Sequence, residues 1–267
     1  MNSSRLKSII IVILVLTNSF LLVLLLGRRT QKYAIREREL AELTRLYAAS
    51  SITLEPTRIP DGTLRLSAVE PTRSFESEAS FAESIIGTCS TEEVGGGIYR
   101  YANGDAQCLI RSSGSVEAAL DRAVDDPEAF CESLFSTHGY GRLSSSVYSG
   151  TGVVTAARML PNATVFNAEL TLRFSNGHLI SVIGQYVPPV EADDHGRGID
   201  SVTALVRFLD YSNISGEVCT AVTDVQGGYL LQSATSAPQR LLPVWKITTD
   251  VAEYYVNASS GEVTRDS

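Results

Sequence analysis

The sequence has few of the residues that most often carry enzyme chemistry. Its 267 residues include four cysteines and three histidines. Nucleophilic catalysis needs a base beside an activated hydroxyl or thiol, and none of His138, His178 and His195 lies in a nucleophile motif such as Gly-x-Ser-x-Gly. We interpret all three as surface imidazoles, and we assign no catalytic residue. The sequence therefore predicts a protein that is not an enzyme.

The cysteines are also too sparse for several protein classes. Cys89, Cys108, Cys131 and Cys219 are scattered, which excludes a disulfide-dense miniprotein, and none has the paired short spacing of a zinc site. Two disulfides of unknown pairing and four buried free thiols are the two alternatives. The acidic stretch "EADD" before His195 lacks the ligand pattern of a calcium loop. We therefore expect no metal and no cofactor.

Positive charge is scarce beyond the N-terminal region. The formal charge is −8, and seven of the 22 Lys and Arg residues lie within residues 1–38, together with one acid, Glu37. Residues 39–267 thus hold 15 basic and 29 acidic residues, a formal charge of −14. Because phosphate binding needs a basic face, this balance argues against a nucleic-acid partner.

The chain does contain one long hydrophobic run, "SIIIVILVLTNSFLLVLLLG" at residues 8–27. At about 1.5 Å per residue, such a helix spans roughly 28 Å, close to the hydrocarbon thickness of a bilayer. The following "LLLGRRT" lacks the small residues of a signal-peptide cleavage site. We predict an uncleaved transmembrane anchor, whose orientation the flanking charges leave open.

The middle of this run is polar. Asn18 has an amide that lipid cannot satisfy, and its neighbours Thr17 and Ser19 allow close approach of another helix. We predict that Thr17, Asn18 and Ser19 contact a partner helix in the membrane. The alternative is that a long apolar span tolerates one uncharged amide.

Residues 28–51 contain strong helix formers and no Gly or Pro, with Leu40, Leu43 and Tyr47 near heptad spacing. They predict a helical stalk, or else one amphipathic helix that packs on its own domain. Pro56, Pro60 and Gly62 then break the pattern, so a first α+β lobe is expected over residues 52–125. Within it, Phe81, Ala82, Ile85 and Ile86 share a helical face, and a hairpin turn is expected at Asn103-Gly104.

Residues 126–267 contain the same predicted order of elements twice, in repeats 126–190 and 198–267. "DDPEAFCESLFSTHG" predicts a helix capped by Asp126, followed by strands at about 151–159, 165–174 and 178–187. "GIDSVTALVRFLDYSN" predicts a helix that buries Val202, Leu205, Val206 and Leu209. Strands at about 217–225, 228–234, 242–249 and 253–257 follow it. The predicted fold class is α+β, with each antiparallel sheet covered by a helix.

Several stretches resemble a known family. "LLPVWKITTDVAEYYVNASSGEV" resembles the last hairpin of PepSY-type modules, with Trp245 expected in the core. With "CTAVTDVQGGYLLQ", the short N-terminus, the hydrophobic run and the "SFAESIIGTCSTEEVGGGIYRYANGDA" stretch, the order of elements is similar to that of the YycI and YycH family of membrane-anchored accessory proteins.

This resemblance implies a cytoplasmic tail at residues 1–7, a single span at 8–27 and an extracytoplasmic domain of two lobes. It implies a role in modulating a sensor histidine kinase of cell-wall signalling in Gram-positive bacteria, with that kinase and a paralogous YycH-type protein as partners. It supplies no catalytic residue. The alternative function is a tethered PepSY-like module that binds or inhibits secreted hydrolases or peptides.

Overall fold

The computed structural model describes residues 14, 17–18, 35–161, 163–190, 195–234 and 237–266. The helical elements are residues 35–49, η1 (Pro56–Arg58), α2 (Phe75–Ile86), α3 (Pro127–His138) and α4 (Ser201–Ser215). The strands are β1 (Thr53–Leu54), β2 (Ser90–Gly95), β3 (Ile98–Asn103), β4 (Ala106–Ile110), β5 (Ser115–Ala123), β6 (Tyr140–Ser145), β7 (Gly152–Leu160), β8 (Ala163–Ser175), β9 (His178–Gln185), β10 (Ala221–Ala234), β11 (Ala237–Thr249), β12 (Glu253–Asn257) and β13 (Val263–Arg265). The predicted α+β class is confirmed.

The described strands form one continuous 13-stranded sheet rather than separate sheets. Its main order is β13-β12-β11-β10-β8-β9-β5-β4-β3-β2, with β7 and β6 branching from β8. The pairs β1 with β10 and β10 with β8 are parallel, whereas the other pairs are antiparallel. The sheet therefore keeps the expected meanders but joins them through β8.

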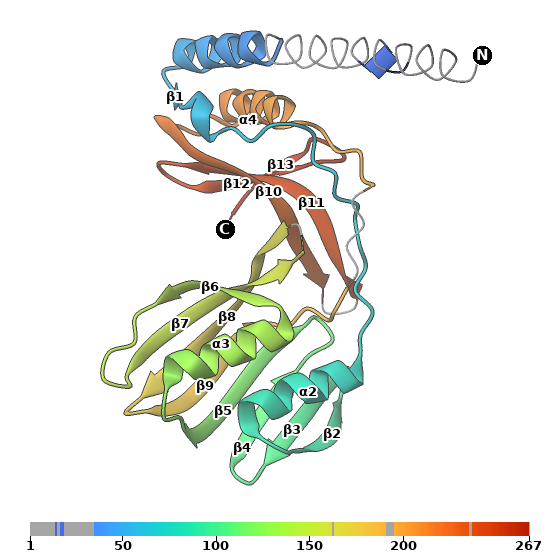
Figure 1. Cartoon of the computed structure of the whole chain (residues 1–267), viewed down its shortest axis with the longest axis vertical. Helices are drawn as coiled ribbons and strands as arrows, with labels where there is room; N and C mark the ends of the chain where they lie inside the picture. The colour runs from blue at the N-terminus through green and yellow to red at the C-terminus, as the bar shows by residue number, and fades with distance from the viewer. Residues whose placement is uncertain are drawn as a thin grey trace, which may run out of the picture.

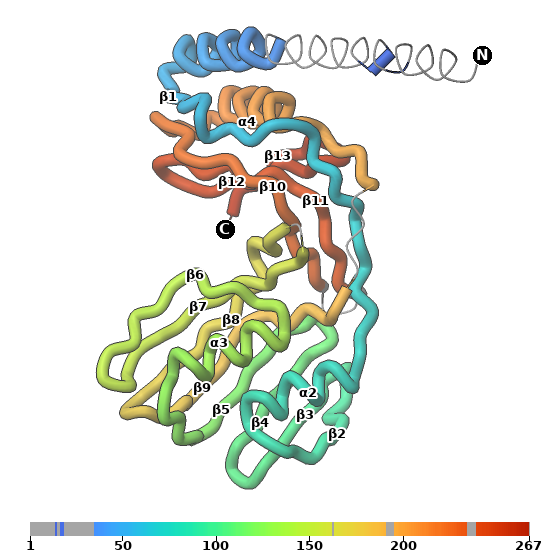
Figure 2. Tube along the Cα trace, in the orientation of Figure 1, coloured from blue at the N-terminus to red at the C-terminus, as the bar shows by residue number. Residues whose placement is uncertain are grey.

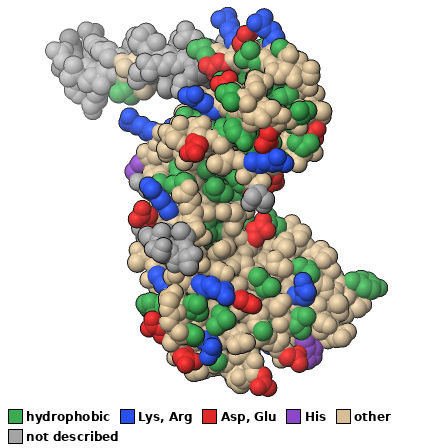
Figure 3. Space-filling model, turned by 180° about the vertical axis from the view of Figure 1, so that it is seen from behind, with side chains coloured by type: hydrophobic (Ala, Val, Ile, Leu, Met, Phe, Trp, Pro, Cys, Tyr) green, Lys and Arg blue, Asp and Glu red, His purple; other side chains and the backbone are tan. Residues whose placement is uncertain are grey.

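The molecule has two lobes (Figure 1). In the central lobe, residues 71–190, helices α2 and α3 lie on one face of strands β2 to β9. In the terminal lobe, formed by residues 35–70 and 195–266, α4 lies over β10 to β13, and helix 35–49 lies outside α4. Residues 59–74 run as an extended segment along one side of both lobes (Figure 2). Acidic, basic and hydrophobic side chains intermingle on the face shown in Figure 3.

Each lobe has its own hydrophobic core. The terminal cluster combines residues of helix 35–49, residues 52–66, the end of the β7–β8 hairpin, and residues 199–263. The central cluster takes its residues from the range 79–186. Each cluster thus contains residues from both of the predicted lobes, 52–125 and 126–267. Of the two predicted repeats, 126–190 packs mainly in the central cluster and 198–267 mainly in the terminal cluster.

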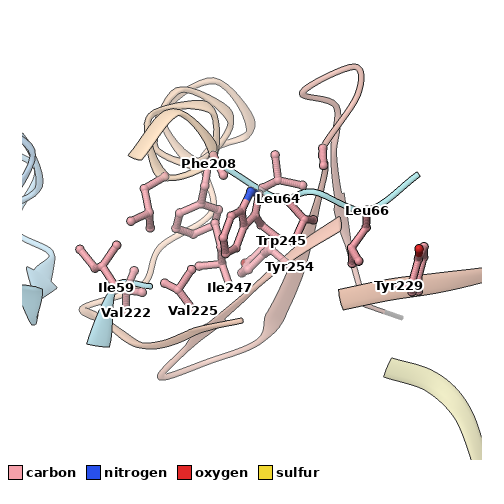
Figure 4. Close-up of a cluster of buried hydrophobic side chains, with 14 of the residues drawn as sticks. Ile59, Leu64, Leu66, Phe208, Val222, Val225, Tyr229, Trp245, Ile247 and Tyr254 are labelled. Atoms are coloured by element: carbon pink, nitrogen blue, oxygen red, sulfur yellow. The ribbon is translucent and has the colours of Figure 1, made fainter. Parts of the chain in front are cut away.

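Trp245 occupies the middle of the terminal core (Figure 4). Its side chain is buried, and its indole Nε1 donates to the Ile199 carbonyl at 2.9 Å. The rings of Phe208 on α4 and Tyr254 on β12 lie 4.8 Å apart, centroid to centroid. The core position expected for Trp245 is confirmed.

The helix boundaries follow local capping chemistry. The Asp126 side chain accepts from the backbone N–H groups of Glu128 and Ala129, as predicted, and α3 ends at Gly139 in the left-handed region. The four residues expected on the buried face of α2 are all buried. Helix α4 differs, because its buried face is centred on Ala204, Leu205, Phe208 and Leu209 while Val206 is exposed.

The hairpin predicted at Asn103-Gly104 forms. The strands expected at 165–174 and 178–187 are joined by Asn176-Gly177, and both of these turn residues have positive φ. Two strands expected at 217–225 and 228–234 are instead the single strand β10. A Cβ on Gly228 would lie 2.6 Å from Phe166, so the glycine allows β8 to pass close to β10. Strand β6 was not predicted.

Strand β8 belongs to both lobes. Its pairing with β7 passes from Ala157↔Glu169 to Arg158↔Val165, which leaves residues 166–168 as an insertion in β8. There Asn167 takes the place of a backbone partner. Its Nδ2 donates to the Leu231 carbonyl at 2.8 Å, and its Oδ1 accepts from the Leu231 N–H at 2.7 Å. This exchange joins β8 of the central lobe to β10 of the terminal lobe.

Candidate functional site

The predicted membrane contact falls at the margin of the structure. Thr17 and Asn18 are helical and exposed, whereas Ser19 and most of the predicted span 8–27 lie outside the described residues. Among the residues that are described, no helix is both long and apolar enough to cross a membrane. The span and its helix contact stay predictions.

Helix 35–49, which follows the hydrophobic run in sequence, is docked on the terminal lobe. Leu43 and Tyr47 are buried in the terminal cluster, and Leu40 packs partly against it. The Tyr47 hydroxyl donates to the Leu205 carbonyl of α4 at 2.8 Å. Burial, with a smaller contribution from Cys219, raises the pKa of Tyr47 well above its usual range, so the hydroxyl remains a donor. Residues 35–49 therefore form an amphipathic helix that packs on its own domain, which was the alternative to a helical stalk.

The beginning of the same helix is held by Arg36. Its Nη2 donates to the Pro60 carbonyl at 2.9 Å and to the Ser201 hydroxyl at 3.2 Å, while its Nε lies 3.2 Å from an Asp61 carboxylate oxygen. Ser201 is the first residue of α4 and itself donates to the Pro60 carbonyl at 2.7 Å. Helix 35–49 is therefore attached to the terminal lobe at both ends.

A second cluster of polar side chains lies where the two lobes meet. Gln239 of β11 donates through Nε2 to the Ser113 carbonyl at 2.9 Å and to the Tyr186 carbonyl at 3.0 Å, both in the central lobe. Its Oε1 is buried without a hydrogen-bond partner. A Cβ on Gly114 would lie 1.7 Å from Gln239 Nε2, so Gly114 makes room for this contact.

Beside this contact lies a buried ion pair. Arg73 donates to both oxygens of Glu78, at 2.7 and 2.9 Å, and to the Gly97 carbonyl at 2.8 Å. Its guanidinium lies 5.1 Å from the Phe75 ring and 4.8 Å from the Tyr99 ring. The Glu78 side chain is 3% exposed. The pair fixes the beginning of α2 to the extended segment that connects the lobes.

All four cysteines are free thiols in the structure. Cys108, Cys131 and Cys219 are buried, and Cys89 is half-buried. Burial is the largest cause that raises the pKa of each thiol, to about 12 for Cys108 and Cys131. At neutral pH these side chains are therefore protonated, which makes them poor nucleophiles.

His138 differs from the predicted surface imidazole, because it lies half-buried between α2 and α3. Its Nε2 is 2.9 Å from the Ser84 hydroxyl, which also donates to the Ser80 carbonyl at 2.9 Å. Burial, followed by the charge of Arg158, lowers the pKa of His138. Nε2 of His138 and the Ser84 hydroxyl thus form a hydrogen bond that joins α3 to α2.

The other histidines lie apart from this pair. Nδ1 of His178, the first residue of β9, lies 2.6 Å from an Asp121 carboxylate oxygen, and His195 is exposed. The "EADD" stretch at residues 191–194, before His195, lies outside the described residues. Within the described part of the chain, no group of three or more His, Cys, Asp or Glu side chains could hold a metal ion.

No family model and no curated protein matches this chain. Solved structures that resemble it share 10% sequence identity. An uncharacterized protein from Eubacterium rectale ATCC 33656 aligns over 76% of this chain and 85% of its own, with a TM-score of 0.44. The Bacillus megaterium YpeB C-terminal domain aligns over 74% and 100%, with a TM-score of 0.35, and YycH from Bacillus subtilis over 78% and 53%, with a TM-score of 0.42. These values assign neither a family nor a function to the chain.

Proposed function

We propose that this protein is a membrane-anchored extracytoplasmic regulator that modulates a sensor histidine kinase. The observation that carries the proposal is the docking of helix 35–49 on the terminal lobe through Leu43 and Tyr47. This helix follows the hydrophobic run at residues 8–27 with only seven residues between them. A partner that moves the lobe would therefore move the chain next to the membrane.

The physical argument rests on the stiffness of the attachment. Buried side chains and hydrogen bonds at Arg36 and Tyr47 hold both ends of the helix, so the helix and the terminal lobe move together. A span that contacts the transmembrane helices of a kinase, through Thr17, Asn18 and Ser19, would pass that displacement on. The sequence resemblance to the YycI and YycH family supplies the class of partner, a kinase together with a YycH-type protein.

The proposal is tested with the full chain and a candidate kinase reconstituted in lipid vesicles. Leu43→Asp places a charge in the terminal core and should undock the helix, so we expect kinase autophosphorylation to lose its response to this protein. Leu46→Asp is the matched control, because Leu46 lies on the same helix and is 43% exposed. A response to Leu43→Asp protein equal to that of wild type would refute the role of the docked helix.

The membrane contact is tested separately. Asn18→Leu keeps the span apolar and removes the amide, so co-purification of the kinase from membranes should weaken. If residues 35–267 without the span bind and modulate their target equally well, the alternative of a tethered binding or inhibitory module replaces our proposal. A reporter fused after residue 267 and active on only one side of the membrane tests the proposed extracytoplasmic location.

A further inference from the structure

We propose that a groove in the central lobe binds a carboxylate ligand through Arg158. The groove lies between the N-terminal half of α2, the C-terminal end of α3, the end of β7 and residues 186–190. Its lining includes Ser77, Ser80, Ser136, His138 and Arg158. This site goes beyond the proposed regulatory function, which does not depend on it.

Arg158 is a buried cation without a carboxylate partner among the described residues. The residue is 6% exposed, and its Nη1 donates to the carbonyls of His138 and Gly139 at the end of α3. Its Nε is buried and makes no hydrogen bond. The side chains that act on it electrostatically are those of Tyr140 and Tyr186, both neutral phenols at neutral pH, and its guanidinium lies 5.7 Å from the Tyr140 ring. Burial of an unpaired charge is costly, so a bound anion would stabilise this arrangement.

The backbone at Gly139 leaves the space that the Arg158 guanidinium occupies. Gly139 has a φ of 68°, and a Cβ there would lie 2.0 Å from Arg158 Nη1. Any other residue at position 139 would therefore displace the guanidinium. The carbonyls at the C-terminus of α3 accept hydrogen bonds from one guanidinium nitrogen, Nη1. The same side chain lines the groove.

The other lining groups favour a single carboxylate over a phosphate. The groove supplies one arginine and no lysine, which matches one negative charge, and the hydroxyls of Ser77 and Ser80 lie in its lining. Apolar side chains, among them Leu160 and Val187, also line the groove. The expected ligand is a small organic acid or the C-terminal carboxylate of a peptide.

The test uses the full-length chain in detergent micelles and isothermal titration calorimetry. The probes are acetate, N-acetyl-trialanine with a free carboxylate, and the same peptide as its C-terminal amide. We expect the free acid to bind and the amide to bind at least about tenfold more weakly, because the charge-assisted hydrogen bonds are lost. Competition by acetate indicates a small-acid site, whereas tight binding of the peptide acid alone indicates a peptide end.

Variants separate binding from folding, since Arg158 also satisfies carbonyls of α3. Arg158→Met should abolish binding of the acid. Glu76, an acid that lines the groove, is exposed, so Glu76→Gln should strengthen binding about two- to threefold, whereas Glu83→Gln on the same helix should leave it unchanged. Likewise Ser136→Asp should weaken binding, while the exposed Ser133→Asp on the same helix should not.

Equal binding of acid and amide, or no binding of any carboxylate probe at millimolar concentration, would overturn the proposal. So would Arg158→Met protein that remains folded and binds the acid as wild type does. Kinase co-purification is measured independently, so failure of the carboxylate site leaves the regulatory proposal standing, and the reverse also holds.

Discussion

Two arginines of the central lobe have different hydrogen-bond partners. Arg73 donates two hydrogen bonds to the buried carboxylate of Glu78, whereas the hydrogen bonds of Arg158 go to backbone carbonyls. Removing either arginine should therefore have a different consequence. Without Arg73 a buried carboxylate is left alone, but without Arg158 no charge is left behind.

Arg73→Met should destabilise residues 35–267 by about 3–5 kcal/mol, because Glu78 becomes an unpaired buried charge. The double variant Arg73→Met with Glu78→Met should recover most of that loss. Arg100→Met is the control, since Arg100 pairs with the exposed Glu92 at 3.1 Å and should cost about 1 kcal/mol or less. Urea denaturation followed by circular dichroism measures all three. A double variant as unstable as Arg73→Met would contradict the ion-pair account.

His138 should make stability depend on pH. Because its pKa is lowered in the folded state, the unfolded chain takes up a proton first as the pH falls below about 6.5, and the folded state loses stability from there down to the folded pKa. His138→Asn protein should therefore lose less thermal stability than wild type between pH 7.5 and pH 5.5. The control is His178→Asn, which removes an imidazole from an exposed pair.

The key site residues were only partly predictable from sequence. Alternation along β7 makes Val154, Ala156, Arg158 and Leu160 the inward positions, and all four are buried. An arginine at an inward position of a predicted strand was the one feature of the sequence that could have indicated the groove. No local signal identified Glu78, Asn167 or Gln239, because their partners lie in segments that only the folded sheet brings together.

At the level of elements, helix 35–49 shows why the stalk and the docked helix could not be separated from sequence. Leu40, Leu43 and Tyr47 have a spacing that suits either a coiled-coil partner or an apolar surface of the same chain. The surface is supplied by α4, and the Tyr47 hydrogen bond spans 158 positions in sequence. Heptad spacing carries no information about a contact at that distance.

Residues 35–267 should accordingly be more stable as a soluble fragment than residues 52–267. The shorter fragment lacks Leu43 and Tyr47 and exposes the apolar surface that they cover. Within the longer fragment, Tyr47→Phe should cost about 1 kcal/mol through the lost hydrogen bond to Leu205. Thermal unfolding compares the fragments, and equal midpoints would show that helix 35–49 adds nothing to the fold.

Strands were predictable where alternation and turn chemistry agree. The hairpin from β8 to β9 has inward Ala168, Leu170, Leu172 and Phe174 and an Asn-Gly turn, and it formed as expected. Strand β6 has one buried residue, Tyr140, so its sequence shows no alternation. Strand β10 was expected as two strands, but it is continuous: its Gly228 permits the close approach of β8, and its Gly227 lies against Leu64 and Trp245.

For the whole molecule, the joint at β8 determines how the lobes are held. Asn167 exchanges two hydrogen bonds with Leu231, and Gln239 donates to two carbonyls of the central lobe. Backbone pairing across the joint is otherwise limited to Tyr229↔Val165 in the β8–β10 pair. Two side-chain amides thus carry much of the polar connection between the lobes.

Asn167→Asp should loosen this joint, because the carboxylate loses the donor to the Leu231 carbonyl and repels that oxygen, at a cost of about 1–3 kcal/mol. Small-angle X-ray scattering of residues 35–267 should show a larger radius of gyration. Asn103→Asp is the matched control, since Asn103 donates to the Ile86 carbonyl within the central lobe. An unchanged scattering profile for Asn167→Asp would show that the joint does not depend on this amide.

The distance in sequence between Tyr47 and Leu205 also determines when the two contacting segments are synthesised. The helix beside the hydrophobic run emerges early, but the α4 surface that receives it is translated only after the central lobe has been made. Until then helix 35–49 has no docking surface. Any partner that binds during biosynthesis would therefore encounter the protein before helix 35–49 is attached to the terminal lobe.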